Sequence, residues 1–524
     1  MGDEVIQVTQ DSARGGFFLL SGTATATVIM AIGSIIIARI LSPSLYGQYS
    51  LTLIVPQILL LFTELGINQG ITKFVAELRS RDETDRIGKI IKHGLLIRAI
   101  MGIAVFAITY IFSDFFAYVF LQRPELAFYL RLASTSILFQ VLLTTTAAAF
   151  VGMDKAEYSA LSTTIQAIAK TIISIILVLL GFAVTGAIIG HVASIAISSM
   201  VGISLLFLVL RKNRKITQPG GFSRDARTLF KYGAPLYISI ILTGFIPLFS
   251  NLILAFFVSD ADVGNYKAAI NFAALLTVLA NPIATALLPA FSKLSSTNKA
   301  IIEFFKFANK YTAIVIVPAT FLVILFSNQI VQIVYGSTYS SAACFLSIYC
   351  LLYLLVGIGY LTLASLYNGL GETKITMQIS TITFVFIIIL APLMTKFYGV
   401  QGLIIAFLIA NIAGQGYAAY TAQKKFQIKF DFPALIKIYS IALVSSVFPL
   451  LVINFVSLPT LIIVAIGGIL YLFIYITLLP ITRVITTYEF SQVTKILQRI
   501  PIIAFIVKPL LKYQQKLLTK IAID

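Results

Sequence analysis

Long apolar segments alternate with short polar segments along this chain of 524 residues. A helix that crosses a membrane needs about 20 mainly apolar residues, and fourteen segments are close to that length or longer. The pattern predicts an all-α polytopic membrane protein with about 14 transmembrane helices. The predicted spans are residues 17–41, 46–71, 93–113, 128–152, 158–180, 184–210, 233–258, 264–291, 309–334, 342–368, 375–396, 400–422, 436–456 and 460–482.

The first twelve spans contain a repeat. Residues 38–50 (ARILSPSLYGQYS) align with residues 255–267 (AFFVSDADVGNYK), 217 positions later, and the alignment matches Gly47 with Gly264. Both segments join the first two spans of their copy. We therefore interpret the two glycines as residues of tight turns.

The same shift of 217 residues continues along the chain. It matches Gly152 with Gly369, and after a slip of one residue VTGAII (184–189) aligns with VQGLII (400–405). A repeat of this size determines the architecture. Because six spans per copy is an even number, both copies enter from the same side of the membrane. The sequence predicts two parallel six-helix lobes related by a pseudo-twofold axis along the membrane normal.

This organisation gives five predicted parts. They are a first six-helix lobe, a cytoplasmic linker, a second six-helix lobe, two extra transmembrane helices and a cytoplasmic amphipathic tail. The linker contains the turn-forming sequence Gln218-Pro219-Gly220-Gly221, and the basic tail is expected to lie against anionic lipid. The bounds of the parts are 1–210, 211–232, 233–422, 423–482 and 483–524.

Composition supports the membrane class and argues against a nucleic-acid partner. The chain is 59% hydrophobic and only 11% charged, whereas soluble proteins carry about 25% charged residues. The net charge of +18 does not form the basic face of a soluble domain, because 31 of the 38 Lys and Arg residues fall in the predicted loops and termini of one side. The positive-inside rule makes that side cytoplasmic. We expect a multi-pass protein of the cell membrane with both termini in the cytoplasm. The basic residues on the outer side are Arg39, Arg123, Arg131, Lys267 and Lys396.

No metal site, cofactor or catalytic domain is expected. Cys344 and Cys350 lie in one apolar span, at a spacing that fits neither a metal site nor a redox pair, and the chain has two histidines, His93 and His191. The polar first 14 residues lack the basic region of a cleaved signal peptide, so the first span is expected to remain. No loop between spans is longer than about 25 residues. An enzyme is therefore not expected.

Two segments resemble those of a known family. ARILSPSLYGQYSL (38–51) and ELGINQGITKFVAEL (64–78) resemble segments of the multidrug/oligosaccharidyl-lipid/polysaccharide (MOP) exporter superfamily, and within it of the polysaccharide biosynthesis flippases of the O-antigen type. The resemblance implies a transporter that flips a polyprenyl- or dolichyl-(pyro)phosphate-linked oligosaccharide from the inner to the outer leaflet by alternating access. Such transport serves cell-surface polysaccharide or glycan biosynthesis. The implied partners are this substrate and the membrane lipids, with H+ or Na+ as a coupling ion to be tested.

Charged residues at membrane depth mark the candidate substrate path, because an unpaired charge in lipid is costly. A lipid-linked sugar needs cations for its phosphate and hydroxyl or amide groups for its sugars. Lys170 is the leading cation, since apolar residues flank it within its span; the alternative is pairing with another polar helix. Arg98 lies one turn into its span, where a side chain can snorkel to the cytoplasmic side. Arg39 and Arg131 lie near outer ends of spans, where interfacial anchoring competes with substrate binding.

Glu64 is the candidate cavity carboxylate. Under the shift of 217 residues it aligns with Asn281. As a functional group it would take up a proton or a sodium ion, or hold an arginine in place; as a structural group it would cap a helix broken near Gly66. Neighbouring Asn68 and Gln69 are candidate sugar contacts, and hydrogen bonding between helices explains them equally well.

The charges break the symmetry of the repeat. Arg39, Arg98 and Lys170 align with Phe256, Val315 and Ile387. The sequence therefore predicts an anion site that is biased toward the first lobe, with neutral groups in the second.

Three other functions stay open. A drug or small-molecule cation antiporter of the same superfamily would need a cavity dominated by carboxylates. A membrane-embedded glycosyltransferase or ligase would need paired carboxylates near a sizeable outer loop, and the longest outer loop offers only Asp114 and Glu125. A structural subunit of an export complex would not need Lys170 and Glu64 at membrane depth.

Overall fold

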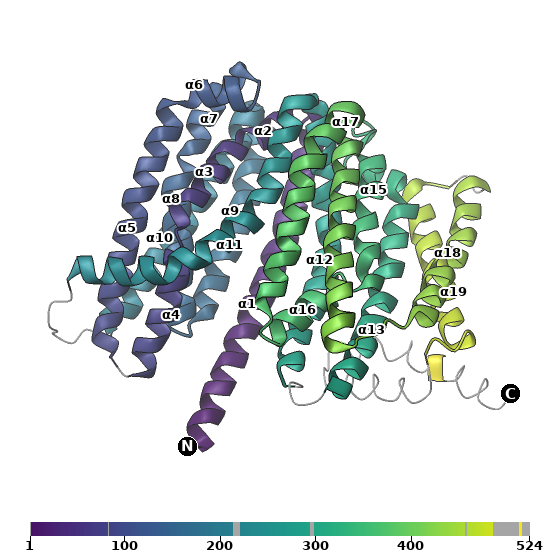
Figure 1. Ribbon diagram of the computed structural model, residues 1–524. Coiled ribbons are helices and arrows are strands. Elements are labelled where there is room, and N and C mark those ends of the chain that lie inside the picture. Colours follow the sequence, from purple (N-terminus) through teal and green to yellow (C-terminus); the bar gives the residue numbers. More distant parts are fainter. Residues whose placement is uncertain are drawn as a thin grey trace. The chain divides into compact units, whose positions relative to one another are not determined.

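The regular elements of the described residues are helices (Figure 1). The computed structural model describes residues 2–81, 83–212, 221–293, 298–455, 458–485 and 513–515. Short π-helical or 3-10 turns are η1 (Phe116–Phe120), η2 (Pro124–Leu126), η3 (Val178–Phe182) and η4 (Leu355–Ile358). The α-helices are α1 (Gly2–Ile40), α2 (Pro43–Thr52), α3 (Ile54–Glu64), α4 (Ile67–Ser80), α5 (Thr84–Ile111), α6 (Ser113–Phe115), α7 (Ala127–Ser134), α8 (Ser136–Gly152), α9 (Ala156–Leu177), α10 (Ala183–Lys212), α11 (Phe222–Phe257), α12 (Asp260–Lys293), α13 (Asn298–Leu325), α14 (Ser327–Val334), α15 (Ala342–Leu354), α16 (Thr362–Gly369), α17 (Thr373–Phe426), α18 (Phe432–Phe455) and α19 (Thr460–Ile481).

Among the described residues, ten helices are long and apolar enough to cross a membrane, or eleven if the bent pair Ala342–Ile358 and Thr362–Gly369 counts as one span. Two of the ten are too long for a single crossing. Ala156–Arg211 has 56 residues and Thr373–Phe426 has 54, whereas a crossing needs about 20. Each contains a turn, at Gly181 (φ 91°) and at Gly399 (φ 56°). The all-α polytopic fold is confirmed, and the total of about 14 spans stays a prediction.

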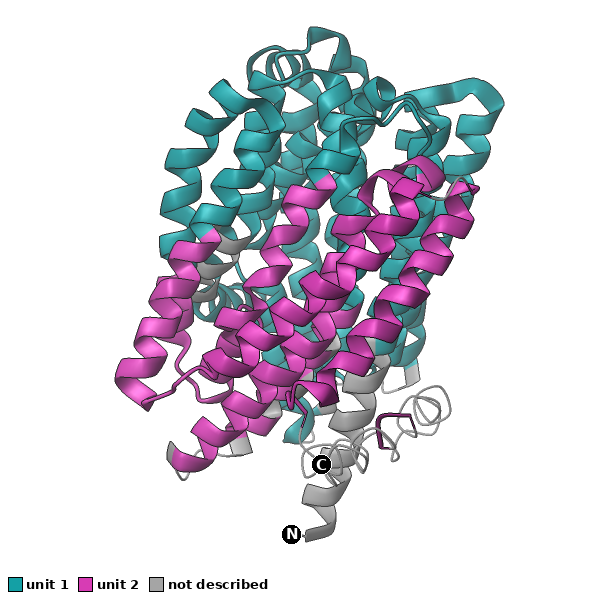
Figure 2. Ribbon diagram, turned by 90° about the vertical axis from the view of Figure 1, so that its right-hand side faces the viewer, with its two compact units in different colours: residues 1–278, 335–345, 380–410 teal, residues 279–334, 346–379, 411–524 magenta. Residues whose placement is uncertain are grey.

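The chain forms two compact units (Figure 2). Unit 1 comprises residues 1–278, 335–345 and 380–410, and unit 2 comprises residues 279–334, 346–379 and 411–524. Unit 1 thus contains the whole predicted first lobe together with parts of the predicted second lobe. The division into two lobes, a linker, two extra helices and a tail stays a prediction. In the linker and the tail, residues 213–220, 486–512 and 516–524 lie outside the described residues.

The first pair of glycines matched by the repeat forms a backbone contact in unit 1. A Cβ atom on Gly47 would lie 1.8 Å from the carbonyl oxygen of Asp260 and 3.1 Å from the nitrogen of Gly264. A Cβ atom on Gly264 would lie 1.9 Å from the carbonyl oxygen of Pro43 and 3.1 Å from the nitrogen of Gly47. The contact is reciprocal, because Pro43 and Asp260 are also 217 positions apart. The interpretation as tight-turn residues is wrong: the glycines lie inside α2 and α12, which cross with their backbones touching.

The second pair of matched glycines makes equivalent contacts in the two copies. A Cβ atom on Gly152 would lie 2.8 Å from a backbone oxygen of α4, and one on Gly369 would lie 2.7 Å from a backbone oxygen of α12. The turns that follow the two glycines are also alike. The amide of Lys155 donates to the carbonyl of Phe150 over 2.8 Å, and the amide of Glu372 donates to the carbonyl of Tyr367 over the same distance. The two copies therefore share helix packing as well as sequence.

The one-residue slip in the repeat has a structural cause in the turn between α9 and α10. That turn contains the π-helical segment η3, in which Gly181 has a positive φ. A π-helical turn closes i→i+5 hydrogen bonds and so holds one residue more than an α-helical turn. The first copy has positive φ at both Gly181 and Ala183, whereas α17 of the second copy has it at Gly399 alone. The extra residue of the first copy lies in this turn.

The start of α11 is docked on helices of unit 1. The helix begins at Phe222, earlier than the predicted residue 233, and its first part runs across the neighbouring helices in Figure 1. Asp225 lies 2.7 Å from the Nδ1 atom of His93 in α5, and Leu229 is fully buried in a core formed with α4, α5, α8 and α10. The ring of Tyr232 lies 4.2 Å from Nζ of Lys73. From residue 222 onward, the predicted linker is a packed helix.

Candidate functional site

A broken helix in unit 1 positions the candidate site. Helix α3 ends at Glu64, and Leu65 and Gly66 have left-handed φ angles of 39° and 71° before α4 begins. Glycine adopts such angles readily, whereas placing a residue such as leucine in this conformation costs roughly 1–3 kcal/mol. The position of Gly66 also leaves no room for a side chain, because a Cβ atom would lie 2.1 Å from the carbonyl oxygen of Gly233 in α11.

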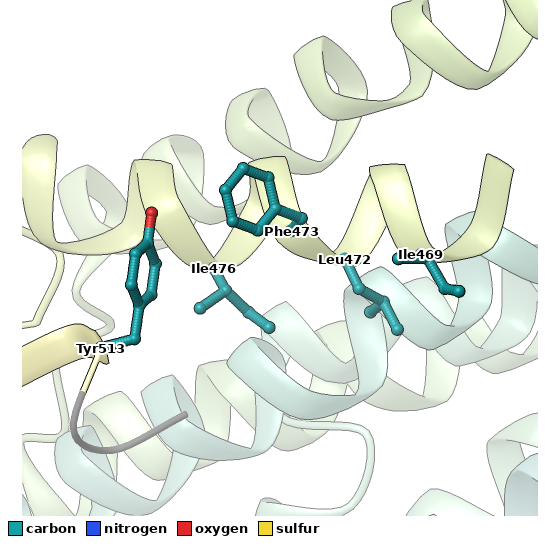
Figure 3. A pocket seen from close by; sticks show the side chains of 5 residues that line it. All are labelled: Ile469, Leu472, Phe473, Ile476 and Tyr513. Carbon is teal, nitrogen blue, oxygen red and sulfur yellow. The ribbon is translucent and has the colours of Figure 1, made fainter. Parts of the chain in front are cut away.

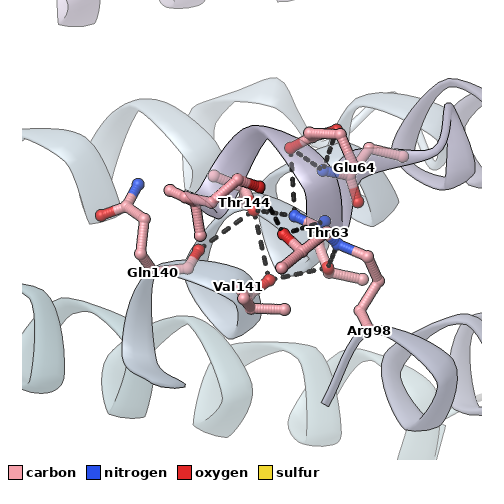
Figure 4. Close-up of polar contacts among 9 residues, drawn as sticks. Thr63, Glu64, Arg98, Gln140, Val141 and Thr144 are labelled. Atoms are coloured by element: carbon pink, nitrogen blue, oxygen red, sulfur yellow. Dashed lines mark hydrogen bonds and ion pairs between the residues drawn. The ribbon is translucent and has the colours of Figure 1, made fainter. Parts of the chain in front are cut away.

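The guanidinium of Arg98 in α5 points at this break and is fully buried (Figure 4). Its Nη2 atom lies 3.0 Å from Oε1 of Glu64, and its Nη1 atom donates to Oγ1 of Thr63 over 2.7 Å. Thr144 and Thr145 of α8 complete the surroundings, accepting from Nη2 over 3.1 Å and from Nε over 3.4 Å. All three threonine hydroxyls donate to carbonyls of their own helices. Their lone pairs are therefore left for the guanidinium.

The Arg98–Glu64 pair is a neutral, hydrogen-bonded unit. A buried guanidinium needs a counter-charge and acceptors, and removing one partner of such a pair costs about 3–5 kcal/mol. The prediction that Arg98 snorkels toward the cytoplasm is wrong, since its side chain is 0% exposed. The pair matches one of the roles expected of Glu64, which was to hold an arginine in place. Ion coupling through Glu64 stays a prediction.

Asn68 and Gln69 lie in the first turn of α4, next to the break, and each has a side-chain oxygen that accepts no hydrogen bond from a described residue. Nδ2 of Asn68 donates to both carboxylate oxygens of Glu64, over 3.1 and 3.2 Å. Oδ1 of Asn68 and Oε1 of Gln69 are buried and accept no hydrogen bond from any residue that the structure describes. A buried acceptor without a donor costs about 1–3 kcal/mol. These oxygens can therefore accept hydrogen bonds from a hydroxyl-bearing ligand or from water.

Lys170 lies in the second half of α9 and is half-buried. Within the described part of the chain it forms no ion pair or hydrogen bond. His191 of α10 lies within electrostatic range of Lys170, and its Nδ1 atom is buried without a hydrogen-bond partner among the described residues. The two helices pack closely, because a Cβ atom on Gly190 would lie 2.2 Å from Oγ of Ser174. This packing brings an unpaired cation near an unpaired imidazole nitrogen.

Lys267 is a second unpaired cation, which lies on the predicted outer side and is not among the residues predicted to form the site. It lies about two turns into α12, half-buried and without an ion pair to a described residue. It is three residues after Gly264 and four before Asn271, so the three lie on one face of the helix. That face contacts α2, where Nδ2 of Asn271 donates to the hydroxyl of Tyr46 over 2.7 Å. Lys267 belongs to the second copy, so the predicted bias of the anion site toward the first copy stays a prediction. Its helical spacing from Gly264 was the signal in the sequence that could have drawn attention to it.

Arg39 and Arg131 take no part in the Arg98 network. Nε of Arg131 donates to Oγ of Ser113 over 2.8 Å, and Nη2 pairs with Asp114. The side chains of this ion pair are 42% and 69% exposed. Arg39 is exposed in the last turn of α1. Both positions fit anchoring at helix ends, the alternative to substrate binding.

A groove of about 360 Å³ in unit 2 is apolar (Figure 3). Its lining consists of Ile469, Leu472, Phe473 and Ile476 of α19 together with Tyr513. The hydroxyl of Tyr513 forms a 3.0 Å hydrogen bond with Oγ1 of Thr477. Because none of the five lining residues carries a charge, the groove offers no group that would hold a phosphate.

Comparison with known proteins connects this geometry to a family. The model of the family described as "Polysaccharide biosynthesis protein" matches residues 12–295, which is more than half of the chain. A second family model, described as "Lipid II flippase MurJ", matches residues 237–477. The two matches overlap and together extend over most of the helical region.

Individual relatives are distant. The lipopolysaccharide biosynthesis protein WzxC of Escherichia coli strain K12 is 27% identical over 252 residues, which are 44% of this chain and 50% of WzxC. A Shigella dysenteriae protein, whose name assigns it to O-antigen transport, is 22% identical over 380 residues, which are 71% of this chain and 90% of that protein. The solved structure of the lipid II flippase MurJ in an inward closed conformation has a TM-score of 0.72 at 18% identity, covering 88% of this chain and 99% of that one. The MurJ likeness shows a common fold.

Proposed function

The chain belongs to the family of polysaccharide biosynthesis proteins, and from this premise we propose that it flips a polyprenyl- or dolichyl-(pyro)phosphate-linked oligosaccharide from the inner to the outer leaflet. One observation carries the proposal. Lys170 and Lys267 lie in membrane-spanning helices of unit 1 without an acidic partner among the described residues. Unpaired charges at membrane depth are costly and mark substrate paths. An anionic phosphate supplies the missing counter-charge.

The groups around the broken helix complement the rest of such a substrate. The sugars carry hydroxyl donors, and the buried oxygens of Asn68 and Gln69 are acceptors without donors. The guanidinium of Arg98 already makes four hydrogen bonds. We therefore assign Arg98 and Glu64 to shaping the wall of the path, and the two lysines to the phosphate.

A cation antiporter is the second candidate, and the buried acids argue against it. In the described residues of unit 1, Glu64 pairs with Arg98, Asp225 with His93 and Asp260 with Arg123. A cationic drug would have to displace a basic side chain to reach any of these carboxylates. An anionic substrate meets no such competition at Lys170 and Lys267.

Ion coupling is a further part of the proposal. A sodium ion or a proton that binds Glu64 would compete with the Arg98 guanidinium, 3.0 Å away. Coupling through Glu64 would therefore require the Arg98 side chain to leave it during transport. A dependence of flipping on a Na+ or pH gradient that disappears in Glu64→Gln would support this coupling, and unchanged dependence would exclude Glu64 as the coupling residue.

The proposed location is the cell membrane, with both termini on the cytoplasmic side. The positive-inside distribution of Lys and Arg supports this orientation. Cysteines introduced into the termini and labelled in intact cells with a membrane-impermeant reagent would test it.

The experiment that tests the function is export of the glycan by point variants. Lys170→Ala is expected to abolish cell-surface glycan while the protein remains in the membrane, and Lys170→Arg to retain part of it. The matched control is Lys396→Ala, because Lys396 is exposed in α17. Normal surface glycan in Lys170→Ala would remove Lys170 from the substrate path. Flipping of a labelled lipid-linked oligosaccharide in proteoliposomes tests the substrate class directly.

A further inference from the structure

Arg123 joins a loop of the first copy to two helices of the second copy, all within unit 1. It lies between η1 and η2, in the loop predicted to be on the outer side. Its Nε atom lies 2.6 Å from Oδ1 of Asp260, the first residue of α12. Its Nη1 and Nη2 atoms donate to the carbonyls of Ala255 and Val258 over 3.0 and 2.7 Å. A cation placed on the last carbonyls of α11 also complements the negative end of that helix.

Residues of the first copy bind both carboxylate oxygens of Asp260. Arg123 binds Oδ1, and Nε2 of Gln48 in α2 donates to Oδ2 over 3.1 Å. The side chains of Arg123 and Asp260 are only 17% and 13% exposed. Such low exposure separates this pair from surface ion pairs, which contribute little because solvent screens them.

Three other contacts connect the two copies near the same point. The backbones of Gly47 and Gly264 touch where α2 crosses α12. Tyr46 accepts a hydrogen bond from Asn271. The hydroxyl of Tyr339 donates to the carbonyls of Ala38 and Leu41 at the end of α1, over 2.5 and 3.2 Å. In Figure 1, α2, α6 and α7 lie at the same end of unit 1.

We propose that Arg123, Asp260 and Gln48 form a latch that holds the predicted outer end of the substrate path closed, and that this latch opens in each transport cycle. The inference rests on the proposed function, since alternating access requires contacts between the copies to break at one end while they form at the other. Arg123 is a positioning residue: it binds no substrate and sets the population of the outer-closed state.

The chain offers a matched control in the same loop region. Arg131 also pairs with an acid, Asp114, and both residues of that pair belong to the first copy. Removing Arg131 therefore deletes an ion pair at the same end of unit 1 without cutting a connection between the copies. A general loss of stability would affect both variants, whereas loss of the latch would affect Arg123 alone.

The test measures access from outside to a cysteine beyond the latch. The probe is Ser50→Cys in a Cys344→Ser/Cys350→Ser background, because Ser50 is three residues after Gly47 and lies on the same face of α2. Intact cells are treated with a membrane-impermeant maleimide. Arg123→Ala and Asp260→Ala should each raise the labelling rate by about tenfold by populating the outer-open state. The double variant should match the single ones, because the two side chains act as one pair.

The outcomes separate this inference from the proposed function. Labelling of Arg123→Ala at the rate of Arg131→Ala would overturn the latch, as would fully additive effects in the double variant. If Arg123→Ala fails to reach the membrane, Asp260→Asn gives the same comparison with a smaller change. The assay needs no substrate, so faster labelling together with normal glycan export in Lys170→Ala would support the latch and contradict the assignment of Lys170.

Discussion

Gly47 and Gly264 face each other across a contact in which neither residue leaves room for a Cβ atom. The residues are 217 positions apart. A Cβ atom on Gly47 would clash with Asp260 and one on Gly264 would clash with Pro43, and the repeat matches Pro43 with Asp260. A contact that maps onto itself under the repeat lies on or near the pseudo-twofold axis. The most evident match in the sequence is therefore the place where the two copies of the repeat touch.

Alanine at this contact is expected to destabilise the protein. The added Cβ atom of Gly47→Ala would lie 1.8 Å from a backbone oxygen, which cannot rotate away. Overpacking of this kind costs about 1–3 kcal/mol. Thermal unfolding in detergent measures the loss. Gly468→Ala is the control, because its Cβ atom meets nothing within 4 Å, and it should be neutral or gain about 0.5–1 kcal/mol. Equal midpoints for the two variants would contradict the contact.

Arg98→Met is expected to cost about 3–5 kcal/mol, because it leaves the largely buried Glu64 carboxylate without its partner. The double variant Arg98→Met/Glu64→Gln should recover part of this loss, since it removes the lone charge. Arg131→Met breaks an exposed pair and should change stability by about 0–1 kcal/mol. The measurement is again the unfolding midpoint. A double variant less stable than Arg98→Met would argue against the ion pair as the source of the loss.

Lys267→Ala is expected to lower flipping of a lipid-linked oligosaccharide about tenfold or more, because the proposed phosphate site would lose one of its two counter-charges. Lys267→Arg keeps the charge and should retain most activity. Initial rates in proteoliposomes check both. Unimpaired flipping by Lys267→Ala would leave the phosphate to the first copy alone, as the sequence predicted.

Ala183→Gly is expected to stabilise the protein by about 1 kcal/mol. Ala183 has φ 43° and ψ −124°, a conformation that suits glycine. The equivalent residue of the second copy is Gly399, with φ 56° and ψ −141°. Gly399→Ala should therefore have the opposite effect, and the two midpoints can be compared in one experiment. A lower midpoint for Ala183→Gly would show that the alanine side chain contributes more than its backbone strain costs.

The all-α membrane fold could be predicted because the hydrophobic segments and the repeat can be recognised in the sequence alone. Gly66 in the sequence indicates the broken helix, and pairing with an arginine is one of the roles that the sequence predicts for Glu64. Which arginine it binds could not be predicted, since Arg98 lies 34 positions away on another helix. Packing of α3, α5 and α8 decides that pairing, and no spacing in the sequence encodes it.

The surroundings of two basic residues could not be predicted, because both lie near helix ends. Lys267 and Arg98 both lie one or two turns from the end of a predicted span, where sequence alone cannot separate an interfacial side chain from a buried one. For Arg98, the hydroxyls of Thr63, Thr144 and Thr145 make burial favourable. For Lys267, the crossing of α2 and α12 directs that face of the helix toward its partner.

The contact between Gly66 and Gly233 has a mechanical consequence. It joins the break after α3 to α11 through backbone atoms alone, since a Cβ atom on either glycine would overlap the other residue. Side chains in a contact can adapt to small displacements by changing rotamers. A contact between backbone atoms cannot adapt in this way. A shift of the break that carries Glu64 toward α11, the helix with which the second copy begins, would therefore require α11 to move as well.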